Sequence, residues 1–279
     1  MDQPRTLFAV FLYLIGFLSS FSVFAEQFDQ DFSGQKIIIA GTGDSQKLLR
    51  NIARELESKL KGGKIEIPDT VGSTGGIKAL LAGRADLARV ARPLLENEKK
   101  YNLTYLLFAK NPVVFVTHPS VAQIHNLKIQ DIMDIYSAKI TNWKSVGDKN
   151  HKIYPVTREP GDASVKILLK YRPDFHVNKK ATKVIFSNPK TIEALVNHKY
   201  TLGFLPLSNV KGTNLRVMNL DGISPTIENV QSGKYPLTMP LGIVYKEKPQ
   251  GLAKVFIDFL YSKKGQDIIL DFGAIPIPR

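Results

Sequence analysis

The stretch that decides the fold is Val71-Gly72-Ser73-Thr74-Gly75-Gly76-Ile77-Lys78. Before it, Ile65 and Ile67 alternate as in a β-strand, and after it apolar residues recur at the spacing of an α-helix. The glycines permit a sharp turn, and the hydroxyl groups of Ser73 and Thr74 can cap the helix or donate hydrogen bonds outward. Free N–H groups and the helix dipole favour negative charge at a helix N-terminus. The stretch therefore predicts either an anion site or an ordinary strand-to-helix turn.

Two further stretches have the same order of strand, turn and helix. A strand over 36–40 leads into Gly41-Thr42-Gly43-Asp44-Ser45 and a helix over 46–60. A strand over 153–157 leads into Arg158-Glu159-Pro160-Gly161-Asp162-Ala163-Ser164 and a helix over 165–171. Three such units can direct three helix N-termini at one cleft, so the repeated pattern favours a shared anion site over unrelated turns.

Residues 1–25 have the features of a cleavable signal peptide. The apolar segment 7–18 is too short to span a membrane comfortably, and Val23 and Ala25 are the small residues that a signal peptidase recognises. We therefore expect cleavage after Ala25. An uncleaved anchor is the alternative, because Asp2 offsets the positive charge of Arg5 ahead of the apolar segment.

Composition excludes several kinds of site. The chain has no cysteine, which rules out disulfides, thiolate metal ligands and a lipid anchor on cysteine. Its net charge of +13 is spread over scattered lysines and arginines, which indicates a solvated basic surface and supports an anionic partner only weakly. Export makes nucleic acid an unexpected partner. With 279 residues, the chain is long enough for two domains.

The rest of the chain alternates strands with helices, which predicts an α/β fold with mostly parallel sheets. A strand over 105–117 is expected to be broken into two halves by Lys110-Asn111-Pro112, where the chain could pass between domains. The lone Trp143 is expected to be a packing anchor. The other predicted elements are helices over 129–136, 191–198 and 252–271, the last of them long and amphipathic, and strands over 202–205 and 237–245.

Several segments, in this order, resemble the phosphate-type substrate-binding proteins of ABC importers. The resemblance covers nearly the whole chain after the signal peptide. It rests on 41–45, 72–80, 85–88, the segment 135–143 that ends in Asn142-Trp143, the arginine turn 157–162, Leu202-Gly203-Phe204, and 256–272. It implies an α/β, two-lobed periplasmic-binding-protein-like fold in which each lobe is a mostly parallel sheet flanked by helices. The ligand cleft would lie between the lobes, which would comprise 26–111 with 239–279, and 112–238.

The resemblance also implies a function and a set of ligand-binding residues. The protein would capture phosphate or a similar small oxyanion in the periplasm, or outside the cell, for an ABC permease of the inner membrane. It would close its lobes about a hinge and act as a monomer. Arg158 would pair with the anion, because a guanidinium can direct two N–H donors at one oxyanion. The implied ligand-binding residues are Thr42, Gly43, Asp44, Ser45, Ser73, Thr74, Gly75, Arg158, Gly161, Asp162 and Ser164.

The arginine turn departs from the family pattern, in which Gly-Ser-Gly-Thr follows. Here the residues are Gly161-Asp162-Ala163-Ser164, and Pro160 stands where an acidic acceptor is usual. A buried carboxylate beside an anion is costly unless it accepts a proton from that anion. Phosphate can supply this proton near neutral pH, whereas sulfate cannot. Asp44 or Asp162 could therefore replace the lost acceptor, or the cleft could bind another ligand or none.

Two other functional classes are open at this point. An enzyme is the less expected, because none of the five histidines stands in a metal-binding spacing and no Gly-x-Ser-x-Gly elbow occurs. We expect no catalytic residue, metal or cofactor. The other class is a sensory or interaction protein with the same fold and a changed or lost ligand, which the altered arginine turn would favour.

Overall fold

The computed structural model describes residues 30–279, so the predicted signal peptide lies outside the described residues. In the first part of the chain the elements are β1 (Lys36–Gly41), α2 (Gln46–Glu57), β2 (Lys64–Glu66), α3 (Gly72–Leu81), β3 (Leu87–Val90), α4 (Glu96–Lys99) and β4 (Thr104–Thr117). Strands and helices alternate along this part, as the apolar periodicity predicts.

The middle of the chain continues the alternation. Its elements are β5 (Asn126–Leu127), α5 (Ile129–Tyr136), a short 3-10 helix (Trp143–Val146), β6 (Tyr154–Arg158), α6 (Ala163–Tyr171), β7 (Lys183–Ile185), α7 (Asn188–Asn197), β8 (Thr201–Pro206), α8 (Leu207–Val210), β9 (Arg216–Val217), β10 (Asn219–Leu220) and α9 (Ile227–Gln231). The chain then returns to the first part through β11 (Thr238–Tyr245), α10 (Gly251–Tyr261), α11 (Lys263–Asp271) and β12 (Ile275–Pro276).

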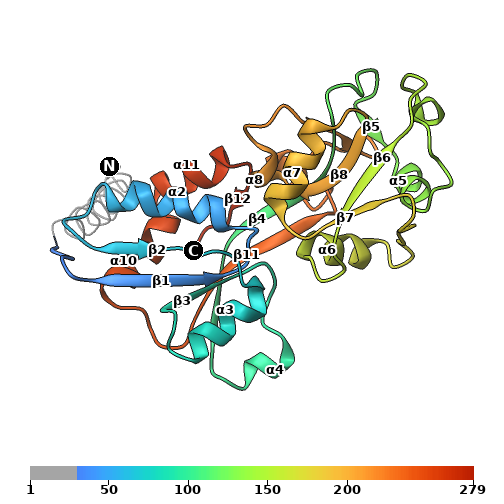
Figure 1. Cartoon of the computed structure of the whole chain (residues 1–279). Helices are drawn as coiled ribbons and strands as arrows, with labels where there is room; N and C mark the ends of the chain where they lie inside the picture. Colours follow the sequence, from blue (N-terminus) through green and yellow to red (C-terminus); the bar gives the residue numbers. More distant parts are fainter. Residues whose placement is uncertain (1–29) are drawn as a thin grey trace, which may run out of the picture.

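The first part and the returning segment form one half of the molecule (Figure 1). Strands β2, β1 and β3 are parallel neighbours, with Ile37 opposite Ile65 and Ile39 opposite Leu87. Ile37 and Ile39 are buried, and α2 packs against β2 and against α10 and α11. The opposite face carries α3, whose Ile77 packs in a separate apolar cluster on β3 and β11. Helices on both faces are what a buried parallel sheet requires.

The second half is built around β8, β6 and β7, which are also parallel neighbours. Helices α6 and α7 both pack against β6 and β8. Trp143 is fully buried, and its indole N–H donates to the carbonyl oxygen of Tyr200 at 2.9 Å. The prediction of a packing anchor is therefore confirmed, since a buried indole normally has such an acceptor.

Two long strands, β4 and β11, join the halves into one ten-stranded sheet. Eight strands follow the path β2-β1-β3-β11-β4-β8-β6-β7, and the short strands β9 and β12 pair with β4 beside it. The predicted break at 110–112 is wrong, because β4 is a single strand of 14 residues. Pro112 is instead where β4 changes partner: it stands opposite Thr238 of β11, and Val113 begins the pairing with β8. A proline, which donates no N–H, is tolerated where one ladder ends and the next begins.

The predicted helix over 252–271 is two helices. Ser262 lies between α10 and α11 in extended conformation, and its hydroxyl oxygen accepts from the N–H of Gly265 at 3.1 Å, so it caps the second helix. Gly265 sits so close to Phe259 that a β-carbon there would lie 1.9 Å from the Phe259 carbonyl oxygen. The helical spacing of apolar residues continues past Ser262 because α10 and α11 both pack against the same half of the molecule.

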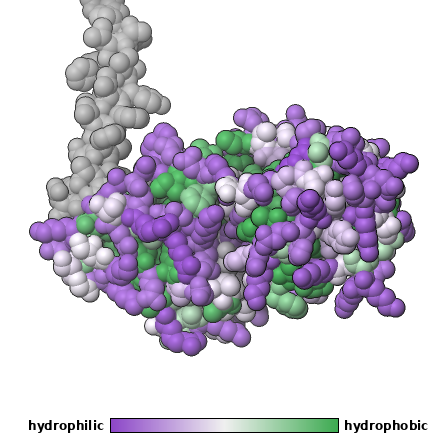
Figure 2. All heavy atoms as spheres, turned by 45° about the horizontal axis from the view of Figure 1, so that its top comes forward, coloured by the Kyte–Doolittle hydropathy of each residue, from purple (hydrophilic) through white to green (hydrophobic). Residues whose placement is uncertain are grey.

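The surface of the described part is mostly polar. Figure 2 shows one face on which hydrophilic side chains predominate and hydrophobic residues gather in small patches. None of the helices in residues 30–279 combines the length and the apolarity that crossing a bilayer requires.

Candidate functional site

A cleft of about 1830 Å³ is lined by residues from both halves of the molecule. The turns that follow β1, β6 and β7 reach it, so the carboxyl ends of parallel strands from the two sides face each other. Eight of the eleven predicted ligand-binding residues line this cleft: Thr42, Gly43, Asp44, Ser73, Thr74, Arg158, Gly161 and Asp162. The other three, Ser45, Gly75 and Ser164, lie outside its lining.

A buried arginine holds the turn after β1 in place. Arg89 donates from Nε to the carbonyl oxygen of Thr42 at 2.7 Å and from Nη2 to that of Pro68 at 2.9 Å. Burial lowers the pKa of Arg89 to about 10, so the guanidinium stays charged at neutral pH. The Thr42 hydroxyl in turn donates to Asp44 Oδ2 at 2.7 Å, which holds the Asp44 carboxylate at the cleft. Ser45 is fully buried behind the turn, and its hydroxyl has no partner among the described residues.

The second turn forms the first turn of α3. Ser73 Oγ accepts from the N–H of Ala91 at 3.0 Å, and Thr74 Oγ1 accepts from Arg92 Nη2 at 3.0 Å. Each hydroxyl still has its own proton to donate into the cleft. Gly76 lets α3 lie directly on β1, because a β-carbon there would be 2.6 Å from the backbone of that strand. The close approach of α3 to β1 brings these two turns together.

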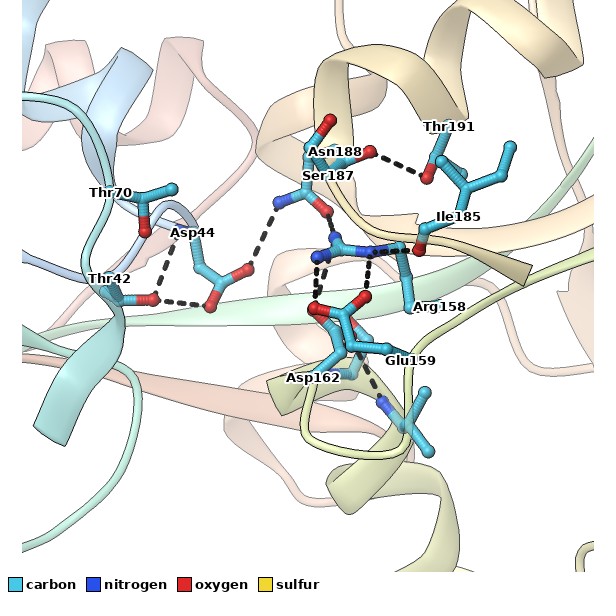
Figure 3. A network of polar contacts seen from close by, with 12 residues as sticks. Thr42, Asp44, Thr70, Arg158, Glu159, Asp162, Ile185, Ser187, Asn188 and Thr191 are labelled. Carbon is cyan, nitrogen blue, oxygen red and sulfur yellow. Dashed lines mark hydrogen bonds and ion pairs between the residues drawn. The ribbon is translucent and has the colours of Figure 1, made fainter. Parts of the chain in front are cut away.

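Arg158 is the central cation of the cleft (Figure 3). It ends β6, is only 8% exposed, and its Nε donates to the Ile185 carbonyl oxygen at 3.1 Å, which fixes its direction. Glu159 binds it with two oxygens, at 3.0 Å to Nε and 3.1 Å to Nη2. Nη1 lies 3.2 Å from Asp162 Oδ2 and also donates to Asn188 Oδ1. The guanidinium is therefore shared among protein acceptors.

The third turn positions Asp162 by capping α6. Asp162 Oδ1 accepts from the N–H groups of Ser164 at 2.9 Å and Val165 at 3.3 Å. The cap leaves Oδ2 directed at Arg158. Gly161 lines the cleft beside it, whereas Ser164 is 1% exposed and its hydroxyl has no partner among the described residues.

Sequence reasoning missed a fourth unit, from β7 through Phe186 and Ser187 to α7. Asn188 begins this helix and reaches across the cleft, where its Nδ2 donates to Asp44 Oδ1 at 3.2 Å (Figure 3). Ser187 caps the helix, and Pro189 occupies its first turn. Ser187-Asn188-Pro189 after an apolar strand is a helix-start signal that could have been recognised. No comparable sequence pattern indicated the contact between Glu159 and Arg158.

Within the cleft, the carboxylates of Asp44, Glu159 and Asp162 lie around Arg158. Burial, followed by the negative charge of Asp44, raises the pKa of Asp162 to about 6, although Arg158 acts in the opposite direction. Glu159 adds a further, smaller raising effect. An arrangement of this kind can hold a proton between acidic oxygens, so it can distinguish ligands that carry a proton from ligands that carry none.

Comparisons with known proteins agree with this architecture. The chain is 28% identical to the phosphate-binding protein PstS of Borreliella burgdorferi over 221 residues, which cover 75% of this chain and 78% of that protein. A substrate-binding protein from Clostridium perfringens, solved with bound phosphate, superposes with a TM-score of 0.75 at 26% identity over 87% of this chain and 100% of its own. An ABC-type phosphate transport receptor from Vibrio cholerae gives 0.66 at 25% identity over 87% and 100%. Residues 28–264 match the PBP superfamily domain, and the chain therefore belongs to the PBP superfamily.

Proposed function

We propose that this protein binds phosphate, or a similar small oxyanion, between its two lobes and presents it to an ABC permease of the inner membrane. The observation that carries the proposal is the position of Arg158, buried in the cleft wall and opposite the turn after β1. Relatives at 25–28% identity that cover most of the chain are described as phosphate-binding or phosphate-transport proteins, which supports the same ligand.

The location and organisation of the protein follow from this role. We propose export by the signal peptide 1–25 to the periplasm or the cell exterior, and action as a monomer without catalysis. The lobes would be 26–111 with 239–279, and 112–238. Strands β4 and β11 cross between them, so bending at these strands would open and close the cleft.

Donors for the anion would come from both lobes. The hydroxyls of Ser73 and Thr74 and the backbone N–H groups of the turn at Gly43 would contribute from one lobe. Arg158 and the turn at Gly161 would contribute from the other. Because donors on opposite lobes bind the same ion, binding would favour the closed form.

An incoming anion would have to compete for Arg158 with the carboxylates already bound to it. Glu159 is the easier one to displace, because its side chain is 27% exposed, against 5% for Asp162. Asp162 is also held by the helix it caps, whereas no backbone group of residues 30–279 donates to the Glu159 carboxylate. We therefore propose that Glu159 turns away from Arg158 when the ligand binds.

The remaining carboxylates would select the ligand by its protons. Asp44 and Asp162 both face the position next to Arg158, and two acidic oxygens close to an oxyanion require a shared proton. Phosphate carries one near neutral pH and sulfate does not. We therefore expect phosphate to be bound and sulfate to be excluded.

The test is calorimetric titration of the dialysed protein at neutral pH, with phosphate and sulfate in parallel. Saturable heat with phosphate and none with sulfate would support the proposal. Equal binding of both would contradict the role of the carboxylates. Heat with neither, from a sample shown to be folded and ligand-free, would favour a sensory or interaction role, in which Arg158 is neutralised permanently by its own carboxylates.

A further inference from the structure

Asn188 occupies a position in the cleft that the binding of an anion does not by itself explain. It is the first residue of α7 and is 9% exposed, and its side chain lies between Arg158 on its own lobe and Asp44 on the other (Figure 3). The start of α7 is fixed, because the Ser187 carbonyl oxygen accepts from the Thr191 hydroxyl at 2.9 Å. The backbone therefore holds the Asn188 amide in this place.

The two ends of the amide match their partners in chemistry. Oδ1 accepts from the guanidinium of Arg158, and Nδ2 donates to the carboxylate of Asp44 at 3.2 Å. The reverse orientation would place an N–H₂ group against a cation and an oxygen against an anion. The side-chain amide of asparagine supplies this acceptor and this donor on two separate atoms without a charge of its own.

This contact spans the two proposed lobes. Among the described residues, the side-chain hydrogen bonds that cross between them occur at Asn188–Asp44 and at Asn111–Ser208. Asn111 lies on β4, the strand that connects the lobes, so its bond can persist while they move. The Asn188–Asp44 bond lies in the cleft and requires the lobes to be together.

We propose that Asn188 is a positioning residue that latches the lobes in the closed form by linking Arg158 to Asp44. The inference rests on the proposed function for its ligand, but the latch itself needs no ligand. It holds the arginine turn and the turn after β1 in a fixed position relative to each other. A net hydrogen bond to a charged group corresponds to about 10- to 100-fold in an equilibrium constant, so losing the latch should shift closure and affinity by about tenfold or more.

The decisive variant is Asn188→Asp. It keeps an oxygen toward Arg158 and suits a helix N-terminus, so α7 should form normally. It removes the N–H donor to Asp44 and places a second carboxylate next to that of Asp44. The swap Asn188→Asp with Asp44→Asn restores one donor and one acceptor across the same gap. Asn197→Asp, at the exposed far end of the same helix, is the control.

Closure can be measured directly because the chain has no cysteine of its own. Spin labels on Lys78→Cys of α3 and Lys170→Cys of α6, both exposed, report the distance between the lobes by pulsed electron resonance, without and with phosphate. We expect Asn188→Asp to move the distances to longer values, the swap to restore most of the short ones, and the control to match the parent. Calorimetry should show Asn188→Asp to bind phosphate at least about tenfold more weakly.

Several results would overturn the latch. These are unchanged distances in Asn188→Asp, a swap no better than the single variant, or a parent whose lobes stay apart both without and with phosphate. The double variant Asn188→Asp with Asp44→Asn is judged only by the distance between the spin labels, because Asp44 belongs to the proposed ligand site. If the parent fails to bind phosphate, the proposed function fails, but the ligand-free distances still decide whether Asn188 holds the lobes together.

Discussion

The buried carboxyl group of Asp162 predicts that the stability of the protein falls as the pH rises from about 4 to about 6. In the folded state, burial and then the charge of Asp44 raise the pKa of Asp162 to about 6, against the lowering effects of Arg158 and of the Val165 N–H. In the unfolded chain the group is solvated and has the ordinary value of about 3.9. The folded protein therefore binds a proton that the unfolded chain has already released.

The sign and size of the effect follow from this difference. The contribution is fully present below pH 4, where both states are protonated, and is lost as the pH rises through 6. A shift of about two pKa units corresponds to roughly 3 kcal/mol. The effect also depends on closure of the cleft, because an open cleft would return the carboxyl group to water.

Asp162→Asn isolates this contribution. Asparagine is an equally good helix cap, so α6 should keep its start, while the titration disappears. Urea unfolding of the variant and the parent, at pH values from 4 to 7, should show the difference in free energy of unfolding shifting by about 3 kcal/mol in favour of the variant. Asp69→Asn is the control: hydrogen bonds from Arg50 and Gln46 lower the pKa of this exposed carboxylate, so its effect on stability is lost only as the pH falls to about 4 and below, and the difference should stay nearly constant from pH 5 to 7.

A difference between Asp162→Asn and the parent that stays constant across this pH range would refute the reasoning. It would mean that the carboxyl group titrates alike in both states, and hence that the closed cleft is not the dominant form without ligand. Carbon NMR of the Asp162 carboxyl group would then show an ordinary pKa.

Three further predictions concern single residues. Arg158→Ala should weaken phosphate binding by about 100-fold or more in calorimetry, because charge-assisted donors are lost and three carboxylates remain, while circular dichroism stays that of the parent. Gly76→Ala should cost about 1–3 kcal/mol in urea unfolding, since its β-carbon would lie 2.6 Å from the backbone of β1, whereas Gly161→Ala, with open space around it, should cost little. Trp143→Phe should cost about 1–3 kcal/mol, measured by circular dichroism during urea unfolding, because the smaller ring leaves a cavity in the core and the Tyr200 carbonyl keeps only the Tyr154 N–H of its two donors.

Local chemistry made much of this fold predictable. Strand, turn and helix follow one another at 36–57 and 154–171 because alternation, glycine and helical spacing are properties of neighbouring residues. The same reasoning failed at Pro112 and Ser262. At Pro112 a distant partner decides, because β8 takes over the pairing of β4. At Ser262 the cause is local and was overlooked: the serine hydroxyl caps α11, and Gly265 packs against the carbonyl oxygen of Phe259.

The site was predictable to the level of its turns and not to the level of its atoms. Ser73 and Thr74 line the cleft as expected, but their oxygens accept from Ala91 and Arg92, residues of the strand end that lies next to α3. A sequence pattern shows that a hydroxyl group is available; it does not show which donor reaches it first. Ser45 illustrates the limit, because the same kind of turn leaves its hydroxyl fully buried.

The contacts that define the cleft join residues that no local pattern relates. Asp44 and Asn188 are 144 residues apart and belong to different lobes, yet they share a hydrogen bond because β4 and β11 carry the chain across and back. Each of the four strand–turn–helix units presents polar groups at the carboxyl end of a strand, which is a local outcome. Which units face each other depends on the order of strands in the sheet. The net charge of +13 therefore says little about the ligand: net charge is a sum over the whole chain, whereas ligand selection depends on the few groups that topology brings together around Arg158.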